Sequence, residues 1–173
     1  GAGVSAGGVF ALTVHDGELV AGGDFPIMGG IFADGVAVWD GVNWRGIGQN
    51  MSGFEAGLMD LSVFRGDLVA CGTFIGAPSV GRWTGTTWQA LGNPACGPFP
   101  SAMIEYRSDL YVGGLIQSAG GQQVNGIARW NGANWSAVGT GLNGAFPSGV
   151  VTSFLVVDQS LIVGGGFPGA GGI

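Results

Sequence analysis

One sequence motif, repeated along the chain, constrains the fold more than any other feature of the sequence. It begins Leu19-Val-Ala-Gly-Gly-Asp-Phe25 and, after a Gly-rich linker, ends Val36-Ala-Val-Trp-Asp-Gly-Val-Asn-Trp-Arg-Gly-Ile-Gly48. Its first leucine returns at positions 68, 110 and 161, so the spacings are 49, 42 and 51 residues. Periods of this length are typical of propellers and solenoids, in which each repeat is one small supersecondary unit.

Each repeat contains runs of alternating or apolar residues that are too short for helices. In the first repeat these runs are Val9–His15, Leu19–Gly23, one that ends at Trp39 and one that starts at Trp44. Asp16-Gly17 separates the first two runs, and this dipeptide favours a tight hairpin because type I′ turns need positive φ. No segment shows a helical period with caps. We therefore predict an all-β fold, a β-propeller of four-stranded antiparallel blades.

The repeat boundaries predict a single propeller segment over residues 1–173, with three full blades and half of a fourth. The predicted blades cover about 9–48, 58–92, 101–139 and 150–173. Natural propellers need about 4–8 blades, and an unfinished blade leaves open edges that invite pairing. We therefore expect either a segment of a larger ring or one subunit whose edges another chain meets.

A Gly-Gly doublet that closes the second strand, followed by paired aromatics around a tight turn, resembles the kelch-type propeller repeat. The sequence of the repeat also looks like the repeats of secreted bacterial repeat proteins and of the fungal cortical polarity marker family. The resemblance covers nearly the whole chain and implies a propeller, a fold that hosts many activities. The chain departs from kelch repeats in its closer aromatic pairs, both Trp, and in Cys71-Gly72, which replaces one Gly-Gly doublet.

Composition excludes several classes of function. Glycine accounts for 38 of 173 residues, but 46% of the residues are hydrophobic and six are Trp, so the chain can bury enough surface to fold. Only 9% are charged and the net charge is −6, which lacks the basic footprint of a nucleic-acid-binding protein. No apolar run approaches ~18 residues, so no membrane span is expected. The sequence suggests no cofactor.

Two cysteines, Cys71 and Cys96, allow two interpretations. They are either two buried thiols or one disulfide, which forms only in an oxidising compartment. Cys71 ends the second strand of its blade, and Cys96 lies in the connector to the next blade, on the same predicted side. We therefore predict a Cys71–Cys96 disulfide and an extracellular or cell-surface location.

The tryptophans occur in pairs at the same position of each repeat. They can be aromatic platforms for sugars, or they can fill the gap between neighbouring blades; recurrence at one position favours packing. Asp40 precedes the glycine of the first pair's turn, and Thr84 and Asn131 replace it in the other repeats, so this position serves the turn. The structural tryptophans are Trp39, Trp44, Trp83, Trp88, Trp130 and Trp135.

Few residues could carry chemistry. His15 is the only histidine, so metal sites built on histidine clusters and Ser/His/Asp triads have no support. Asp60 and Glu105 replace small or apolar residues in the first strands of their blades, where a carboxylate could line a central channel and hold water or a cation. Their opposite strand parity argues against an acid–base pair, and a structural or solvated role is the alternative.

These observations favour a non-enzymatic binding or structural scaffold whose connectors present one face to a protein or glycan partner. Low charge and open edges also allow self-assembly. The alternative is a segment of a glycan-processing propeller enzyme whose catalytic residues lie outside this chain. The candidate binding loops are the connectors Asp24–Asp34, Thr73–Ser79, Leu115–Asn125, Gln49–Gly57, Asn93–Pro100 and Thr140–Gly149.

Overall fold

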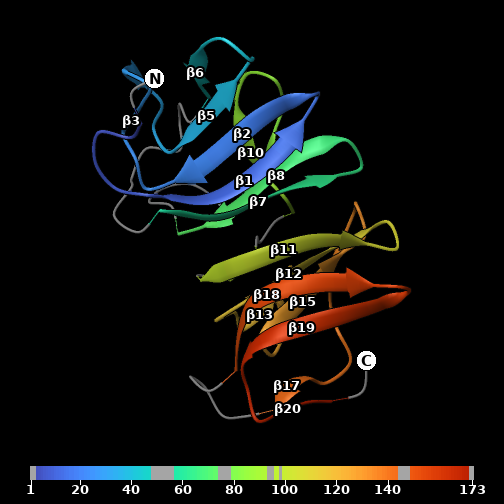
Figure 1. Ribbon diagram of the computed structural model, residues 1–173. Coiled ribbons are helices and arrows are strands. Elements are labelled where there is room, and N and C mark those ends of the chain that lie inside the picture. The colour runs from blue at the N-terminus through green and yellow to red at the C-terminus, as the bar shows by residue number, and fades with distance from the viewer. Residues whose placement is uncertain are drawn as a thin grey trace. The chain divides into compact units, whose positions relative to one another are not determined.

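The computed structural model describes residues 3–47, 57–73, 79–92, 96–97, 99–143 and 149–171. These residues form only antiparallel strands, turns and loops, and they contain no helix (Figure 1). The all-β prediction is therefore confirmed. The chain divides into two compact units, Gly1–Ala90 and Leu91–Ile173. Each unit is described by itself below.

The first unit holds two four-stranded sheets, which are the first two sequence repeats. The strand order is β1-β2-β5-β6 in the first sheet and β7-β8-β9-β10 in the second. Figure 1 shows β1 beside β7, which are the first strands of the two sheets and contact each other. The strands are β1 (Val9–His15), β2 (Glu18–Gly23), β5 (Val36–Trp39), β6 (Trp44–Gly46), β7 (Leu58–Phe64), β8 (Asp67–Gly72), β9 (Val80–Trp83) and β10 (Trp88–Ala90).

The second unit holds the third four-stranded sheet and a two-stranded fourth repeat. The third sheet has the order β11-β12-β15-β16, and β18 pairs with β19. β11 contacts β18, just as β1 contacts β7 in the first unit (Figure 1). The strands are β11 (Pro100–Tyr106), β12 (Asp109–Gly114), β15 (Ile127–Trp130), β16 (Trp135–Ala137), β18 (Val150–Val157) and β19 (Ser160–Gly166).

Short pairings that the sequence analysis did not predict lie in the connectors of the sheets, mainly between second and third strands. A two-residue hairpin forms there in the first and third sheets, and in the second unit β17 pairs with β20. In the first unit, Val4 forms an isolated bridge with Met28 of the hairpin. These short strands are β3 (Ile27–Met28), β4 (Ile31–Phe32), β13 (Ser118–Ala119), β14 (Gln122–Gln123), β17 (Gly141–Asn143) and β20 (Gly169–Gly171).

The turns follow from local chemistry. Asp16 and Gly17, between β1 and β2, have φ of 51° and 79°, so both central residues are left-handed as a type I′ turn requires. In the loop between β5 and β6 only Gly41 has positive φ, and the Asp40 carboxylate accepts hydrogen bonds from the backbone N–H groups of Val42 and Asn43, both at 2.7 Å. Asn131 makes the same two bonds in the third sheet. The prediction that this position serves the turn is confirmed.

At the second position of each doublet, a close backbone contact leaves room only for glycine. A β-bulge shifts the register near the start of each first strand, as between Val9 and Ala11. The bulge brings a carbonyl oxygen close to the end of the second strand: a Cβ added to Gly72 would lie 2.5 Å from the Gly57 oxygen. Gly23, Gly114 and Gly165 are blocked in the same way. The second repeat keeps this glycine, although Cys71 replaces the first one.

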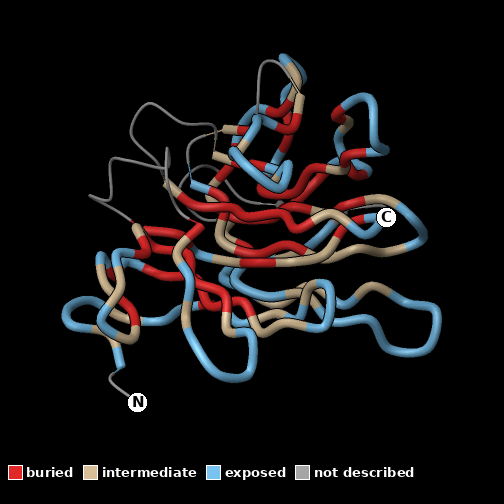
Figure 2. The backbone as a smooth tube through the Cα atoms, turned by 90° about the horizontal axis from the view of Figure 1, so that it is seen from above, coloured by how far each residue is buried: buried red, intermediate tan, exposed pale blue. Residues whose placement is uncertain are grey.

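At the first glycine of the doublet, side chains of the next sheet occupy the space that a Cβ would need. A Cβ at Gly22 would collide with the side chains of Leu58 and Leu61 on β7. These leucines are 0% and 5% exposed and join one apolar cluster with Val20 and other residues of the first sheet. In the second unit, Val151 and Phe154 of β18 cover Gly113 in the same way. Within each unit the core therefore lies between successive repeats. Figure 2 marks the buried parts of the backbone in red.

Candidate functional site

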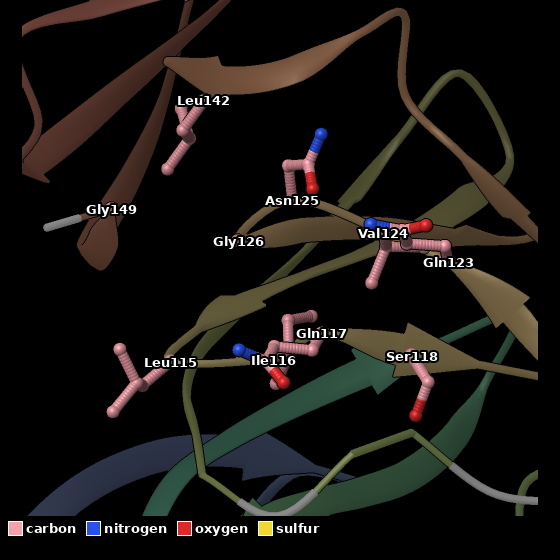
Figure 3. Close-up of a pocket in the computed structure, with 10 residues that line it drawn as sticks. All are labelled: Leu115, Ile116, Gln117, Ser118, Gln123, Val124, Asn125, Gly126, Leu142 and Gly149. Atoms are coloured by element: carbon pink, nitrogen blue, oxygen red, sulfur yellow. The ribbon is translucent and has the colours of Figure 1, made fainter. Parts of the chain in front are cut away.

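A cavity of about 540 Å³ in the second unit is the candidate binding site. Residues of the connector between β12 and β15 line it, together with Leu142 and Gly149 (Figure 3). In Figure 3, Leu115 and Ser118 lie on the lower side of the view, and Leu142 and Asn125 lie on the upper side. Two of the connectors predicted to present a surface, Leu115–Asn125 and Thr140–Gly149, therefore meet here. We call this site the connector cavity.

The lower wall of the connector cavity is a folded loop with its own hydrogen bonds. The β13–β14 hairpin turns at Gly120 and Gly121, whose φ angles of 58° and 75° suit glycine. The Val124 N–H donates to the Gln117 carbonyl at 2.9 Å, and Ile116 and Ala119 are buried. Because buried side chains and backbone bonds fix this wall, its polar side chains extend from a defined backbone.

The upper wall is joined to the connector through Asn125. The Asn125 side-chain amide donates to the Thr140 backbone carbonyl at 2.8 Å, and the Asn125 backbone carbonyl accepts from the Leu142 N–H at 2.8 Å. Leu142 is buried, and a Cβ added at Gly126 would lie 2.7 Å from its Cδ1. Asn125 is therefore structural, and it holds the two walls together.

The polar groups of the connector cavity are uncharged. Gln117, Ser118 and Gln123 are exposed and line the cavity, and none of the described residues that line it is acidic or basic. Within the described parts of the chain, the side-chain amides of Gln117 and Gln123 have no hydrogen-bond partner. Each amide can both donate and accept. The cavity therefore offers neutral hydrogen-bonding groups beside apolar Leu115 and Leu142.

The corresponding connector of the first sheet is built differently. Phe25, Met28 and Ala33 form a buried cluster there with Ala21 and Ala37. Its polar residues are acidic, and burial raises the pKa of Asp34 above the ordinary aspartate value. Several predicted connectors lie partly outside the described residues: residues 74–78 in the second sheet, 49–56, 93–95 and 98, and 144–148.

The tryptophan pairs lie across the outer hairpins of the three sheets. The ring centroids of Trp39 and Trp44 are 5.4 Å apart with an interplanar angle of 50°, and the other two pairs are alike. The Trp88 indole N–H donates to the Ile47 carbonyl of the first sheet at 2.9 Å. Trp135 donates likewise to Leu91 at 2.8 Å. These two contacts join the outer hairpins of the second and third sheets to the end of the preceding repeat, so their rings serve packing.

Trp130 and Trp135 also border a second hollow of about 430 Å³ in the second unit. Both rings are buried, with exposures of 7% and 6%. A sugar stacks on an exposed aromatic face, and these rings do not offer one. The hollow therefore gives the tryptophans no visible role in ligand binding.

Asp60 and Glu105 lie in different units. Asp60 is half-buried on β7 opposite Cys71, and its carboxylate accepts a 2.8 Å hydrogen bond from the Leu61 N–H. Glu105 is half-buried on β11 opposite Leu110. A channel-lining role for either carboxylate stays a prediction. Among the described residues, no group of three or more His, Cys, Asp or Glu side chains is placed to hold a metal ion.

The two cysteines are buried thiols in different units of the structure. Cys71 ends β8, and Cys96 precedes Gly97, whose N–H donates to the Ser118 carbonyl at 2.7 Å. Burial raises the pKa of the Cys96 thiol to about 12. Since the two units are not placed relative to one another, the Cys71–Cys96 disulfide stays a prediction.

The first unit has a charged hollow of about 550 Å³ at the turns of its two sheets. His15 lies there, and its Nε2 is 3.0 Å from the Gly66 carbonyl. Arg82 pairs with Asp67 at 3.0 Å, and Arg45 pairs with Glu18. Each pair lies within one sheet, Asp67 and Arg82 on the adjacent strands β8 and β9, and Glu18 and Arg45 on β2 and β6, so the charges are satisfied locally. We therefore assign this hollow no ligand.

Comparison with known proteins gives a fold likeness and no family. No family model and no curated protein matches the chain. Among solved structures, the chain is similar to the computationally designed Ika8 protein, with a TM-score of 0.56 and 16% sequence identity. The match covers 94% of this chain and 45% of that one, so the chain spans less than half of its length. Within the described residues, no helix is long and apolar enough to cross a membrane.

Proposed function

We propose that this chain is a non-enzymatic, extracellular scaffold module whose connector cavity binds an uncharged polar ligand, a glycan or a peptide segment of a partner. The proposal rests on one observation. The exposed amides of Gln117 and Gln123 line a cavity without charged residues and have no partner in the described chain. A neutral donor–acceptor ligand fits such a lining, because it satisfies both halves of each amide.

We further propose that the repeats belong to a β-propeller of kelch-like type. Three four-stranded antiparallel sheets support this arrangement, and so does the contact between first strands of successive repeats within each unit. Propellers place the connectors between second and third strands on one face. The cavity would then lie on a face that other connectors share. The alternative, a segment of a glycan-processing enzyme, has no supporting cluster of acids and bases at the cavity.

Screening the protein against glycan and peptide arrays tests the proposed binding, and titration calorimetry then measures affinity for each hit. Gln117→Leu with Gln123→Leu removes the free amides and nearly preserves side-chain volume. We expect this double variant to weaken binding about ten-fold or more, since each lost hydrogen bond to a ligand contributes ~1 kcal/mol. Gln89→Leu, an exposed glutamine on β10, is the matched control and keeps wild-type affinity.

The outcome of the same experiment can reject the proposal. Equal affinity of the double variant and the wild type for every hit would remove the cavity from consideration. Conversion of a bound glycan to a shorter product would favour the enzyme alternative instead. Binding without turnover, lost in the double variant alone, is the result that we expect.

A further inference from the structure

The connector cavity adjoins the second hollow of about 430 Å³ that Trp130 and Trp135 border. Gln123 lines both spaces, and Figure 3 shows it at the end of the connector cavity opposite Leu115 and Gly149. β14, which carries Gln123, contacts β16, and all three residues of β16 line the second hollow. The two spaces therefore follow one another along β14, and Gln123 is the boundary between them.

The second hollow adds side-chain amides to those of the connector cavity. Gln122 and Asn134 line it and are exposed, and within the described residues neither side-chain amide has a hydrogen-bond partner. The Asn134 backbone is fixed, because its N–H donates to the Asn131 side chain at 2.8 Å. Together with Gln117 and Gln123, four amides without a described partner therefore line the two adjoining spaces.

The rest of the second hollow is closely packed and uncharged. A Cβ added at Gly92 would lie 2.7 Å from the Trp135 Nε1, and one added at Gly120 would lie 2.8 Å from the Trp135 Cβ. Trp135 is itself held by its hydrogen bond to the Leu91 carbonyl. None of the described residues that line the hollow is acidic or basic. The hollow therefore presents its amides over a fixed surface without charge.

A row of primary amides matches the hydroxyl groups of a sugar. Each amide places donors and an acceptor side by side, and each hydroxyl can likewise donate and accept, so one amide can bond two adjacent hydroxyls of a sugar ring. A peptide strand binds instead through the backbone of an exposed strand and through pockets for its alternate side chains. A neutral sugar also brings no charge that this lining would leave unpaired.

We propose that the ligand is a neutral oligosaccharide that lies along β14 and fills both spaces. Gln117 and Gln123 bind one end of the sugar chain, and Gln122 and Asn134 bind the other end. This inference rests on the proposed function and narrows its ligand to an extended sugar chain. The connector cavity of about 540 Å³ already has the size of a small-molecule site, about 300–1,000 Å³, so only a longer chain also reaches the second hollow.

Affinity as a function of sugar chain length tests this proposal. An array of neutral glucans, xylans, mannans and galactans identifies the sugar that binds. Titration calorimetry of the intact protein then follows unbranched chains of that sugar from about two to about six units. We expect affinity to rise about ten-fold or more along this series, because the longer chains gain hydrogen bonds in the second hollow. Affinity should then level off once both spaces are filled.

A double variant, Gln122→Leu with Asn134→Leu, removes the amides that belong to the second hollow alone. It should weaken binding of the longest chain about ten-fold or more and affect the shortest chain much less. Asn43→Leu with Gln89→Leu is the matched control, since Asn43 takes the place of Asn134 in the first sheet and both control residues are exposed in the first unit. This control should bind every chain like the wild type.

The outcomes separate this inference from the proposed function. Equal affinity of the wild type for short and long chains would overturn the extended site while leaving binding at the connector cavity in place, as would full affinity of the folded double variant for the longest chain. Hits among peptides alone would overturn the sugar ligand and keep the cavity as a peptide site. Binding of no glycan and no peptide would overturn both. Circular dichroism checks folding, and if the double variant is unfolded, Gln122→Leu alone is compared.

Discussion

At the scale of single residues, the glycine doublet combines two separate constraints. The second glycine leaves room for a backbone carbonyl brought in by the β-bulge, whereas the first leaves room for side chains of the next repeat. A backbone oxygen cannot turn away, but a side chain can be replaced by a smaller one. This difference explains why Cys71 can replace the first glycine while Gly72 is kept.

Two adjacent glycines of β19 test this explanation. A Cβ at Gly165 would collide with the Val150 carbonyl, whereas a Cβ at Gly166 would meet nothing within 4 Å. We expect Gly165→Ala to lower the free energy of unfolding by about 2 kcal/mol, because the backbone must shift. Gly166→Ala should change it by less than about 0.5 kcal/mol. Urea denaturation of both variants measures the difference, and equal effects would contradict the carbonyl contact.

Asp40 gives a pH dependence with a defined sign. Hydrogen bonds from the backbone N–H groups of Asn43 and Val42 lower the pKa of its carboxyl below the ordinary value. A carboxyl whose pKa is depressed by folding stabilises the protein above its unfolded pKa and loses that contribution as pH falls through the folded pKa. Asn131 shows that asparagine supports the same turn.

The test compares the melting temperature of Asp40→Asn with that of the wild type from about pH 6 to about pH 3, a range that spans the ordinary aspartate pKa. The wild type should lose more stability than the variant as the pH falls, because only the wild type has the carboxylate. Parallel curves for the two proteins would show that the turn bonds do not depend on its charge.

At the scale of elements, regular strands could be predicted from the sequence and irregular ones could not. β1 has the predicted limits, and β7 and β18 begin where the second and fourth repeats were predicted to begin, because apolar runs and Asp-Gly or similar turns define them. The β-bulges and the two-residue strands β13 and β14 carry no alternation long enough to recognise. The connector cavity was likewise predicted only as a set of loops, since Gln117 and Gln123 acquire their place when the connector folds against Leu142.

The junction between the two sheets of the first unit depends on one polar contact as well as on apolar packing. Trp88→Phe removes the donor to the Ile47 carbonyl and part of the ring, so we expect a loss of about 2–3 kcal/mol in the free energy of unfolding. Trp44→Phe is the matched control, because its indole N–H has no described partner. Trp44→Phe should lower the free energy of unfolding by at least about 1 kcal/mol less than Trp88→Phe does. Thermal and urea denaturation measure both, and equal losses would assign no role to the hydrogen bond.

At the scale of the whole molecule, testing for the predicted disulfide also tests whether the protein resides in an oxidising compartment. If Cys71 and Cys96 are joined, reduction of the denatured protein raises its intact mass by that of two hydrogens. Such a bond would link the two units and require an oxidising environment. Alkylation of both cysteines in denaturant without prior reduction would contradict it. In that case the high pKa of buried Cys96 should make its native thiol slow to react, because the thiolate is the reactive form.

The basic residues of the chain bear on its sensitivity to trypsin-like proteases. All five are arginines. Three pair with the acidic residues Glu18, Asp67 and Asp109, and the other two lie over aromatic rings, each 5.0 Å from the ring centroid. A trypsin-like protease needs an arginine or lysine side chain free to enter its specificity pocket. This sequence contains only five peptide bonds that such a protease could cleave, one after each arginine. In the folded chain, an ion pair or an aromatic ring holds each of these arginine side chains.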